Sequence, residues 1–378
     1  MSERTPPPAT APVREHPGRF RASRFKANLW RKAIPHLFGA HRDDKPLPRP
    51  AIFPPRGRGW GISHYNVVIP ELPAPHLFLG CTTMQGASGF QCHDNDFAVR
   101  DSPRKTATLA LGTAASTHES FTTYSIPLEC ELAPDGSVLR WGADLLITGL
   151  YPEFRLHSRR PGFALDLDIV ATGEHSNYAR SYLYTHLGML ARYTGMITQD
   201  GEITPIAGLC SLEYATGRTP HVLRDRPLPL KLPIDFFTWH VINLDADTQL
   251  QFVQMSAQGG YEVVSSAWLR EAGKGSTRYG GVDFKVLTYQ ADPQVAPDGR
   301  ETYLPETFQA LIPGAHGRQL FELTATLDTQ VHYGLGRGYL GGYHYQGTRS
   351  GKPIAGRGYI EFIEASATQS ERYRYVGL

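Results

Sequence analysis

The residues best suited to binding or chemistry are concentrated between positions 184 and 247 of the 378-residue chain. A carboxyl group and imidazole rings exchange protons near neutral pH, and aromatic rings line pockets for apolar molecules. Side chains two positions apart on a strand share a face, so Tyr184 lies beside His186 and Ser211 beside Glu213. We therefore predict a pocket here, with the candidate residues Tyr184, His186, Ser211, Glu213, Tyr214, Trp239 and His240.

The composition favours a β protein with many turns. The chain has 38 Gly and 29 Pro, which mark turns, and 11% of its residues are aromatic, a class enriched in strands. From residue 60 onward, strand-like runs are separated by Gly, Pro and Asp-Gly turns. The alternation typical of a half-buried antiparallel strand is found at Phe163, Leu165, Leu167 and Ile169. This spacing predicts an all-β meander that closes into a barrel or a sandwich.

Residues 217–233 carry four prolines and no clear period, which makes them the best candidate for a domain boundary. We divide the chain into a tail at 1–57, a first β domain at 58–220 and a second at 221–378.

Residues 1–55 hold 11 Lys or Arg against 4 Asp or Glu, a formal charge of +7, which leaves −5 for the remainder. A slightly acidic body without clustered basic charge argues against nucleic-acid binding.

Within the tail, a short basic amphipathic helix broken near Pro35 is predicted from apolar residues at Phe25, Leu29, Ala33 and Leu37. Its apolar stripe could pack on the protein's own body, or the helix could make peripheral contact with an anionic membrane. No run of 18 apolar residues and no secretion signal pattern is present. The four cysteines are widely spaced and expected to be free thiols, so we predict a cytoplasmic protein.

Three motif types do not indicate a functional site in this sequence. The run Cys92–Asp96 contains metal-ligand residue types, but zinc spacing is absent and a solvated loop is favoured, so no metal site is predicted. The run Gly336–Gly341 matches G-x-G-x-x-G, yet an aromatic strand-like run follows it where a dinucleotide site requires a helix. No G-x-S-x-G elbow of a serine hydrolase occurs.

Three segments resemble the carotenoid 1,2-hydratase/AttH-like family. Gly347–Glu361 resembles its closing G-r-G-Y-x-E hairpin, Asp200–Tyr214 its middle motif, and Trp239–Asp245 a W-F-x-L-Q-L-D strand. The resemblance implies two lipocalin-like antiparallel β-barrels packed together, with a hydrophobic cavity at or near their junction. Members include isoprenoid hydratases, fungal proteins that assist cycloadditions, and plain binding proteins. No cofactor is implied.

The chain departs from the hydratases in the middle motif. Ser211 stands where they carry the catalytic Asp that protonates a double bond, and a serine hydroxyl is far too weak an acid for that task. Glu213 lies on the same strand face, and a carboxyl group in an apolar cavity has a raised pKa and can act as a general acid. Tyr184 and His186 lie about where the family's pocket residues would, and Tyr214 replaces a Trp.

Three interpretations of the function follow. In the first, the protein binds an isoprenoid-, lipid- or polyketide-like molecule in a barrel cavity and catalyses a cofactor-free hydration, isomerisation or cyclisation. Glu213 would donate the proton, His186 and Tyr184 would orient the substrate, and Trp239 would stabilise a carbocation. Ser211, Tyr214, Trp239 and His240 would contact the ligand. In the second, the protein is a non-catalytic carrier that visits membranes through its basic tail. A structural protein with a filled interior is a third interpretation.

Overall fold

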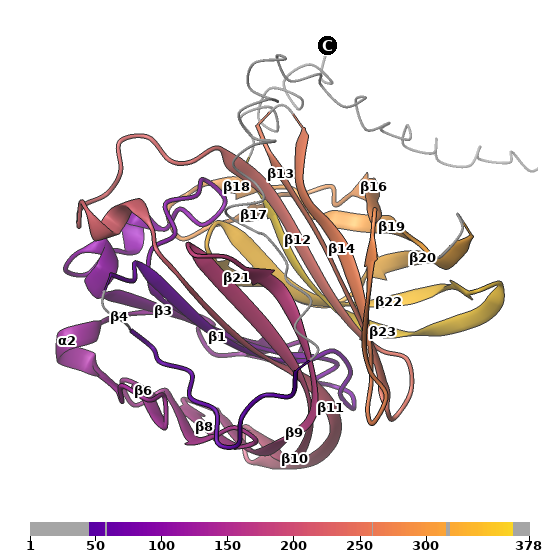
Figure 1. Ribbon diagram of the computed structural model, residues 1–378, viewed down its shortest axis with the longest axis horizontal. Helices are drawn as coiled ribbons and strands as arrows, with labels where there is room; N and C mark the ends of the chain where they lie inside the picture. The colour runs from indigo at the N-terminus through magenta and orange to yellow at the C-terminus, as the bar shows by residue number, and fades with distance from the viewer. Residues whose placement is uncertain (1–44, 57–58, 259, 315–317, 366–378) are drawn as a thin grey trace, which may run out of the picture.

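The computed structural model describes residues 45–56, 59–258, 260–314 and 318–365. Most of these residues are in β-strands, arranged as two large antiparallel sheets that curl toward barrels (Figure 1). The prediction of an all-β protein with two barrel-like sheets is confirmed. The predicted amphipathic helix lies outside the described residues, so that helix and its membrane contact stay predictions.

The first sheet has eleven strands in the order β4-β3-β2-β1-β11-β10-β9-β8-β7-β6-β5. Its strands are β1 (Ile62–Ile69), β2 (Leu79–Gly86), β3 (Thr106–Thr113), β4 (Phe121–Ser125), β5 (Cys130–Leu132), β6 (Val138–Trp141), β7 (Leu145–Leu150), β8 (Glu153–Arg160), β9 (Phe163–Arg180), β10 (Tyr184–Gln199) and β11 (Glu202–Gly217). The first strand pairs with the last of the set, which brings residues near 64 beside residues near 213.

The second sheet has the order β15-β14-β13-β12-β23-β22-β20-β19-β16, with β21 pairing with β22. Its strands are β12 (Ile234–Asn243), β13 (Thr248–Ala257), β14 (Tyr261–Glu271), β15 (Gly275–Gly280), β16 (Asp283–Tyr289), β19 (Pro305–Pro313), β20 (Gln319–Leu327), β21 (His332–Leu335), β22 (Gly338–Arg349) and β23 (Lys352–Glu364). A small separate hairpin is formed by β17 (Gln294–Val295) and β18 (Glu301–Thr302).

Short links explain why both sheets curl. In each sheet the two edge strands are consecutive in the chain: α2 (Ile126–Glu129) joins β4 to β5, and two residues join β15 to β16. Such short connections hold opposite edges near each other, as barrel closure requires. The remaining helical turns are η1 (Asp96–Ala98), η2 (Pro103–Lys105) and η3 (Pro220–Val222).

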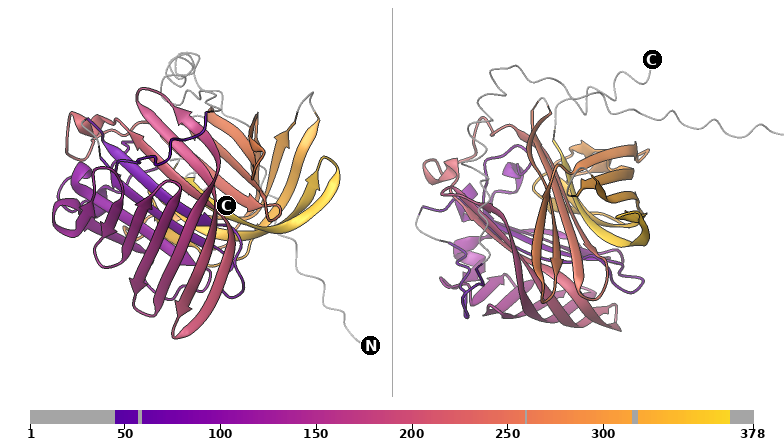
Figure 2. Two further views of the ribbon diagram at one scale, coloured as in Figure 1. Left: turned by 60° about the horizontal axis from the view of Figure 1, so that its bottom comes forward. Right: turned by 45° about the vertical axis from the view of Figure 1, so that its right-hand side comes forward.

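Apolar side chains form three clusters, one for each sheet and one between them. The predicted alternation of β9 is observed, because Phe163, Leu165, Leu167 and Ile169 are buried inside the first sheet. The second sheet encloses its own cluster, which includes Phe252 and Phe308. The third cluster joins the sheets, with Tyr178 from the first and Trp239 from the second. Figure 2 shows how the two sheets pack against each other along this contact.

The connection between the sheets runs from Gly217 to Ile234 and contains η3. The division into two domains at 220/221 stays a prediction.

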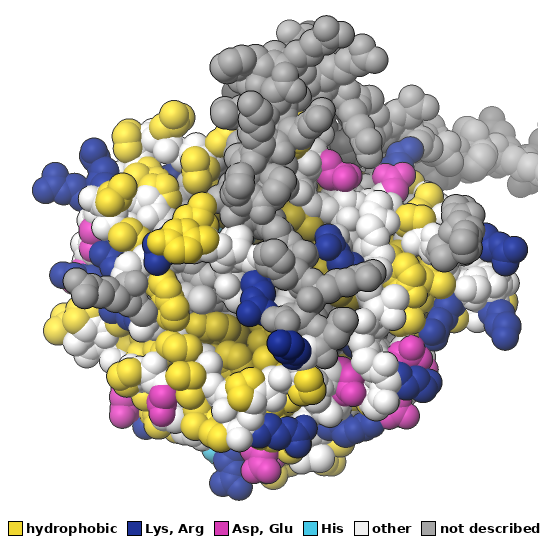
Figure 3. All heavy atoms as spheres, viewed as in Figure 1, with side chains coloured by type: hydrophobic (Ala, Val, Ile, Leu, Met, Phe, Trp, Pro, Cys, Tyr) yellow, Lys and Arg dark blue, Asp and Glu magenta, His cyan; other side chains and the backbone are white. Residues whose placement is uncertain are grey.

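The G-x-G-x-x-G match spans the turn from β21 into β22, so a strand follows it, as expected. Within the described residues, no helix is long and apolar enough to cross a bilayer. On the face shown in Figure 3, Lys and Arg side chains are interspersed with Asp and Glu.

Candidate active site

An apolar cavity of about 420 Å³ lies between the two sheets. Its walls come from β1, β9, β10 and β11 of the first sheet and from β12, β13, β14 and β23 of the second. Ligand pockets begin at about 300 Å³, so the interpretation of a protein with a filled interior is contradicted. The cavity lies at the junction of the two sheets, where the family resemblance implies it, and the interior of each sheet is filled by its own apolar cluster.

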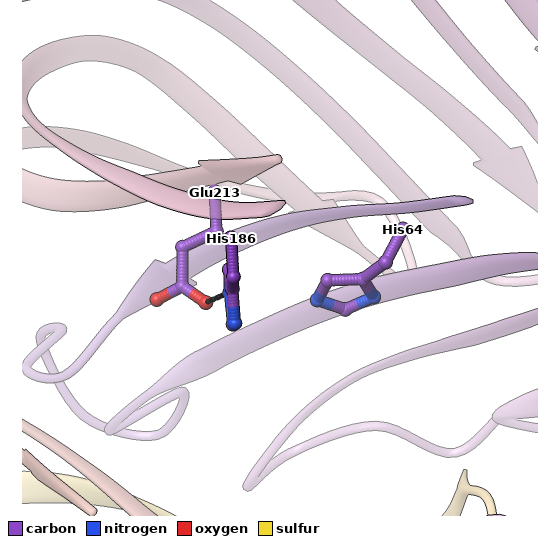
Figure 4. Close-up of side chains that lie close together, drawn as sticks. All are labelled: His64, His186 and Glu213. Atoms are coloured by element: carbon purple, nitrogen blue, oxygen red, sulfur yellow. Dashed lines mark hydrogen bonds and ion pairs between the residues drawn. The ribbon is translucent and has the colours of Figure 1, made fainter. Parts of the chain in front are cut away.

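Three polar side chains project into this cavity from neighbouring strands of the first sheet. His64 of β1 and His186 of β10 both pair with Ala215 of the intervening strand β11. Because Ala215 has only a methyl group, the two rings approach edge to face, with centroids 6.0 Å apart. Glu213 is two residues away on β11, and Figure 4 shows its carboxyl group turned toward His186.

Glu213 is 2% exposed and its two oxygens have different partners. Oε2 lies 3.4 Å from Nε2 of His186, and Oε1 accepts hydrogen bonds from Ser211 (2.9 Å) and Gln251 (3.4 Å). Burial raises the pKa of Glu213, but the hydrogen bond and charge of His186, with smaller effects of His64 and Ser211, bring it below its ordinary value. The expected raised pKa is therefore corrected: Glu213 is a carboxylate.

His64 is a neutral imidazole. Burial, together with the neighbouring His186, lowers its pKa to about 4. Its Nδ1 lies 2.9 Å from the carbonyl oxygen of Thr83. Because a carbonyl oxygen only accepts hydrogen bonds, Nδ1 carries the proton and the lone pair is on Nε2. Burial also lowers the pKa of His93, a further cavity residue, to about 4.

Tyr178 supports His186 from the neighbouring strand. A β-bulge interrupts the pairing of β9 with β10 at this point, and bulges re-aim side chains beside functional sites. The Tyr178 ring meets the His186 ring edge to face, with centroids 4.8 Å apart, and its hydroxyl donates to Gln251 of the second sheet. Gly188 leaves the space for this hydroxyl, since a Cβ there would lie 1.7 Å from it.

A buried polar network behind Glu213 joins the two sheets. The Ser211 hydroxyl donates to Glu213 and accepts hydrogen bonds from Gln251 (2.7 Å) and from Arg270 (3.2 Å). Arg270 is fully buried and also donates to Gln249. The buried carboxylate of Glu213 is thus linked through the Ser211 hydroxyl to the buried positive charge of Arg270. Ser211 does not line the cavity, so its part is to hold Glu213 rather than to contact a ligand.

A second buried carboxyl group reaches the cavity from the other sheet. Glu361 of β23 pairs with Trp239 of β12, is 3% exposed, and lines the cavity. Its Oε1 accepts hydrogen bonds from the Asn66 amide (3.1 Å) and the Tyr359 hydroxyl (3.0 Å). Burial and the negative charge of Glu213 raise the pKa of Glu361 to about 8. The two carboxyl groups therefore hold opposite protonation states at neutral pH.

Four of the residues singled out in the sequence meet on the cavity wall: Tyr184, His186, Glu213 and Trp239. The Trp239 ring stacks with the His186 ring at 6.0 Å between centroids. The Tyr184 hydroxyl lies 3.4 Å from Nδ1 of His186. His186 is therefore surrounded by Glu213 and by aromatic rings, which restricts the orientation of its imidazole.

Two others do not reach the cavity. The Tyr214 side chain faces the core of the first sheet, and its hydroxyl donates to the carbonyl oxygen of Pro54 (2.8 Å). His240 is fully buried in the second sheet, where it stacks on Phe252 at 4.1 Å between centroids. Each directly follows a cavity residue, and successive side chains of a strand point to opposite faces. Tyr214 and His240 therefore contribute to packing.

The sequence reasoning missed His64, Tyr178 and Glu361. Glu361 ends the segment Gly347–Glu361, so its place in that motif is the signal that could have singled it out. His64 and Tyr178 lie in strand-like runs without a motif of their own. Their approach to Glu213 depends on which strands pair, and local pattern does not determine that.

His64, His186 and Glu213 also form a group that could hold a metal ion, with ligand atoms within 4.8 Å of one another. Two imidazoles and a carboxylate are a zinc donor set, and ligand atoms around zinc lie about 3.4 Å apart. The pair Nε2 of His186 and Oε2 of Glu213 matches this spacing at 3.4 Å, but these atoms already contact each other. A cation would have to replace that contact.

The fold and the cavity define a double-barrel, lipocalin-like protein with a pocket large enough for a small molecule. Residues 82–374 match a family of unknown function, DUF6670, and the chain belongs to this family. No match is found among curated proteins. The fold is similar to that of an AttH-like protein from Nitrosomonas europaea (15% identity, 82% of this chain and 95% of the other covered, TM-score 0.57). It is also similar to kievitone hydratase from Nectria haematococca (13% identity, 88% and 98% covered, TM-score 0.53).

Proposed function

We propose that this protein binds a hydrophobic isoprenoid-, lipid- or polyketide-like molecule between its two sheets and catalyses a cofactor-free hydration, isomerisation or cyclisation. One observation carries the proposal: the buried Glu213–His186 pair opens onto an apolar cavity of about 420 Å³. An imidazole held by a carboxylate is a common general base, and apolar walls strengthen its interactions by excluding water. Kievitone hydratase, which shares the fold, supports such a reaction class.

The walls and the rim of the cavity support an apolar ligand. Met84, Phe237, Val253 and Trp268 line the interior. At the rim, Leu223 is 95% exposed although it also lines the cavity. An exposed apolar side chain at the mouth favours entry of an apolar guest. The carboxyl and imidazole groups give the cavity the few polar points that orient a bound molecule.

We infer roles for three residues, and the paired geometry supports them. Nε2 of His186 carries a hydrogen that it donates to the Glu213 carboxylate across 3.4 Å, so His186 exchanges a proton with a guest at Nδ1. Glu213 stabilises the imidazolium that forms, as carboxylates do beside catalytic histidines. This replaces the initial role of Glu213 as proton donor, because its lowered pKa leaves no proton to donate. Trp239 presents a π face that stabilises developing positive charge.

The substitution Glu213→Gln tests this proposal. Native mass spectrometry of protein purified from its own host identifies the co-purifying molecule, which then serves as the assay ligand. The Glu213→Gln variant should keep the ligand and lose turnover by about 10²-fold or more, the usual contribution of acid–base groups. Equal turnover in both proteins would contradict the catalytic proposal.

A carrier without catalytic activity is the second candidate. The same exposed Leu223 at the rim favours it, because such a side chain suits transfer of an apolar ligand to and from another apolar surface. Under this function, the Glu213→Gln variant and the wild-type protein release the identical, unchanged molecule. The basic tail at 1–57 would bring a carrier to anionic membranes. Removing that tail should then reduce transfer between anionic vesicles.

A further inference from the structure

We propose that Glu361 of the second sheet is the proton donor of this cavity. The Glu213–His186 pair of the first sheet is the proton acceptor on the opposite wall. This inference rests on the proposed function and deepens it by assigning an acid and a base to separate walls. A guest between the sheets would meet a proton source on one side and a proton acceptor on the other.

The hydrogen bonds of Glu361 determine which oxygen is available to a guest. Asn66 and Tyr359 both donate to Oε1. The Asn66 amide is itself oriented by Thr82, whose hydroxyl donates to its carbonyl oxygen (2.9 Å). Within the described residues, Oε2 has no hydrogen-bond partner. Because Oε1 accepts two hydrogen bonds, the proton of a neutral Glu361 belongs on Oε2, and the side chain lines the cavity.

The surrounding charges keep the two carboxyl groups different. Glu213 has His186 beside it and Arg270 behind it through Ser211, so its negative charge is compensated. Glu361 faces neutral donors and the Glu213 carboxylate, with no cation among its partners in the described part of the chain. The pKa of Glu213 is lowered while that of Glu361 rises to about 8. Two carboxyl groups whose pKa values are driven apart are the usual acid and base of an active site.

Of the three proposed reactions, isomerisation needs only these groups. Glu361 transfers its Oε2 proton to a carbonyl oxygen or an unsaturated carbon of the guest. His186, whose Nε2–H donates to Glu213, removes at Nδ1 a proton from a C–H activated by conjugation. The double bond moves and the composition of the guest is unchanged. Glu361 is left as a carboxylate and His186 as an imidazolium, and return of one proton restores both. The substrate class is therefore a hydrophobic, unsaturated molecule with an acidic C–H.

The first experiment measures protonation without a substrate. Full-length protein carrying 13C at the glutamate carboxyl carbons is titrated by NMR, and the Glu361→Gln variant identifies the Glu361 signal. We expect that signal to titrate near pH 8. Titration near the ordinary value of about 4.3 would overturn the inference. The exposed Glu322 of β20, replaced by Gln, serves as the matched control and should leave the signal unchanged.

The second experiment uses the conjugated isoprenoid ketone β-ionone as probe in D2O. Binding is followed by fluorescence of Trp239 and Trp268, which line the cavity, and deuterium uptake by mass spectrometry. Glu361→Gln should keep binding and slow uptake about 10²-fold, and Glu361→Asp should restore part of the rate. If Glu213→Gln slows deuterium uptake and Glu361→Gln does not, the role of Glu361 as proton donor is overturned, while the proposed function stands. A wild-type protein that neither binds nor exchanges the probe would count against the proposed function, and the NMR titration would still decide the protonation of Glu361.

Discussion

Asn66 of the first sheet donates a hydrogen bond to Glu361 of the second, 3.1 Å away and across almost the whole length of the chain. On its own sheet Asn66 pairs with Glu213. Asn66 is therefore the cross-strand neighbour of Glu213 and the hydrogen-bond partner of Glu361. This contact is one of several that join the two sheets, together with the hydrogen bonds of Gln251 and Arg270 to the first sheet.

The substitution Asn66→Ala should raise the pKa of Glu361 above about 8, because the amide hydrogen bond lowers that pKa in the native protein. It should also lower the free energy of unfolding by about 1–3 kcal/mol, since a buried acceptor loses its donor. Glutamate carboxyl NMR and urea denaturation measure the two effects. A pKa of Glu361 that moves downward would contradict the described contact.

The stability of the protein should depend on pH through Glu361. Its folded pKa of about 8 lies above the unfolded value, so the folded state holds a proton that the unfolded state releases. The contribution is complete below about pH 4 and is lost as the pH rises toward about 8. Urea unfolding across this range should show a steeper fall in wild type than in Glu361→Gln. Parallel curves for the two proteins would be inconsistent with a raised pKa.

Glu213 should act in the opposite direction at acidic pH. Its folded pKa lies below the unfolded value, so its stabilising contribution is present above the unfolded value and disappears as the pH falls through the folded one. Glu213→Gln should therefore flatten the acid side of the stability profile. The same urea measurements below about pH 5 test this, with Glu322→Gln as the exposed control.

The substitution Gly188→Ala should displace Tyr178, because a Cβ at this position would lie 1.7 Å from its hydroxyl oxygen. We expect the free energy of unfolding to fall by about 1–3 kcal/mol, the usual cost of overpacking, together with weaker ligand binding. Gly280→Ala on β15 is the matched control, since nothing lies within 4 Å of its added Cβ. A Gly188→Ala variant as stable as the control would show that Tyr178 can move without loss.

Chelation should leave ligand binding and turnover unchanged. Nε2 of His186 and Oε2 of Glu213 already contact each other, so the proposed proton transfer needs no cation between them. Dialysis against EDTA, followed by metal analysis and assay, makes the measurement. Activity that disappears on chelation and returns with Zn²⁺ would identify His64, His186 and Glu213 as a metal centre.

Period-two reasoning accounts for what the sequence could predict of the site. It predicted strands, and it correctly placed Tyr184 with His186 on one face. The same rule excludes Tyr214 from the face of Glu213 and His240 from the face of Trp239, because adjacent strand residues point apart. The prediction that Tyr214 and His240 contact a ligand is therefore inconsistent with the strand alternation of the sequence itself.

The rest of the site depends on long-range pairing. His64 reaches His186 because β1 pairs with β11, and Glu361 reaches the cavity because β23 pairs with β12. Strand order of this kind is set by how whole sheets close, and local alternation carries no information about it. The sign of the pKa shift at Glu213 has the same origin, since it is determined by neighbours contributed from other strands.

The cavity lies along the seam between two packed interiors, and each half of the polypeptide contributes one carboxyl group to it. Neither half on its own encloses this cavity. Substitutions at the seam can therefore change which guest is accepted while both interiors keep their packing. A scaffold built in this way separates the residues that make it fold from the residues that decide what it recognises.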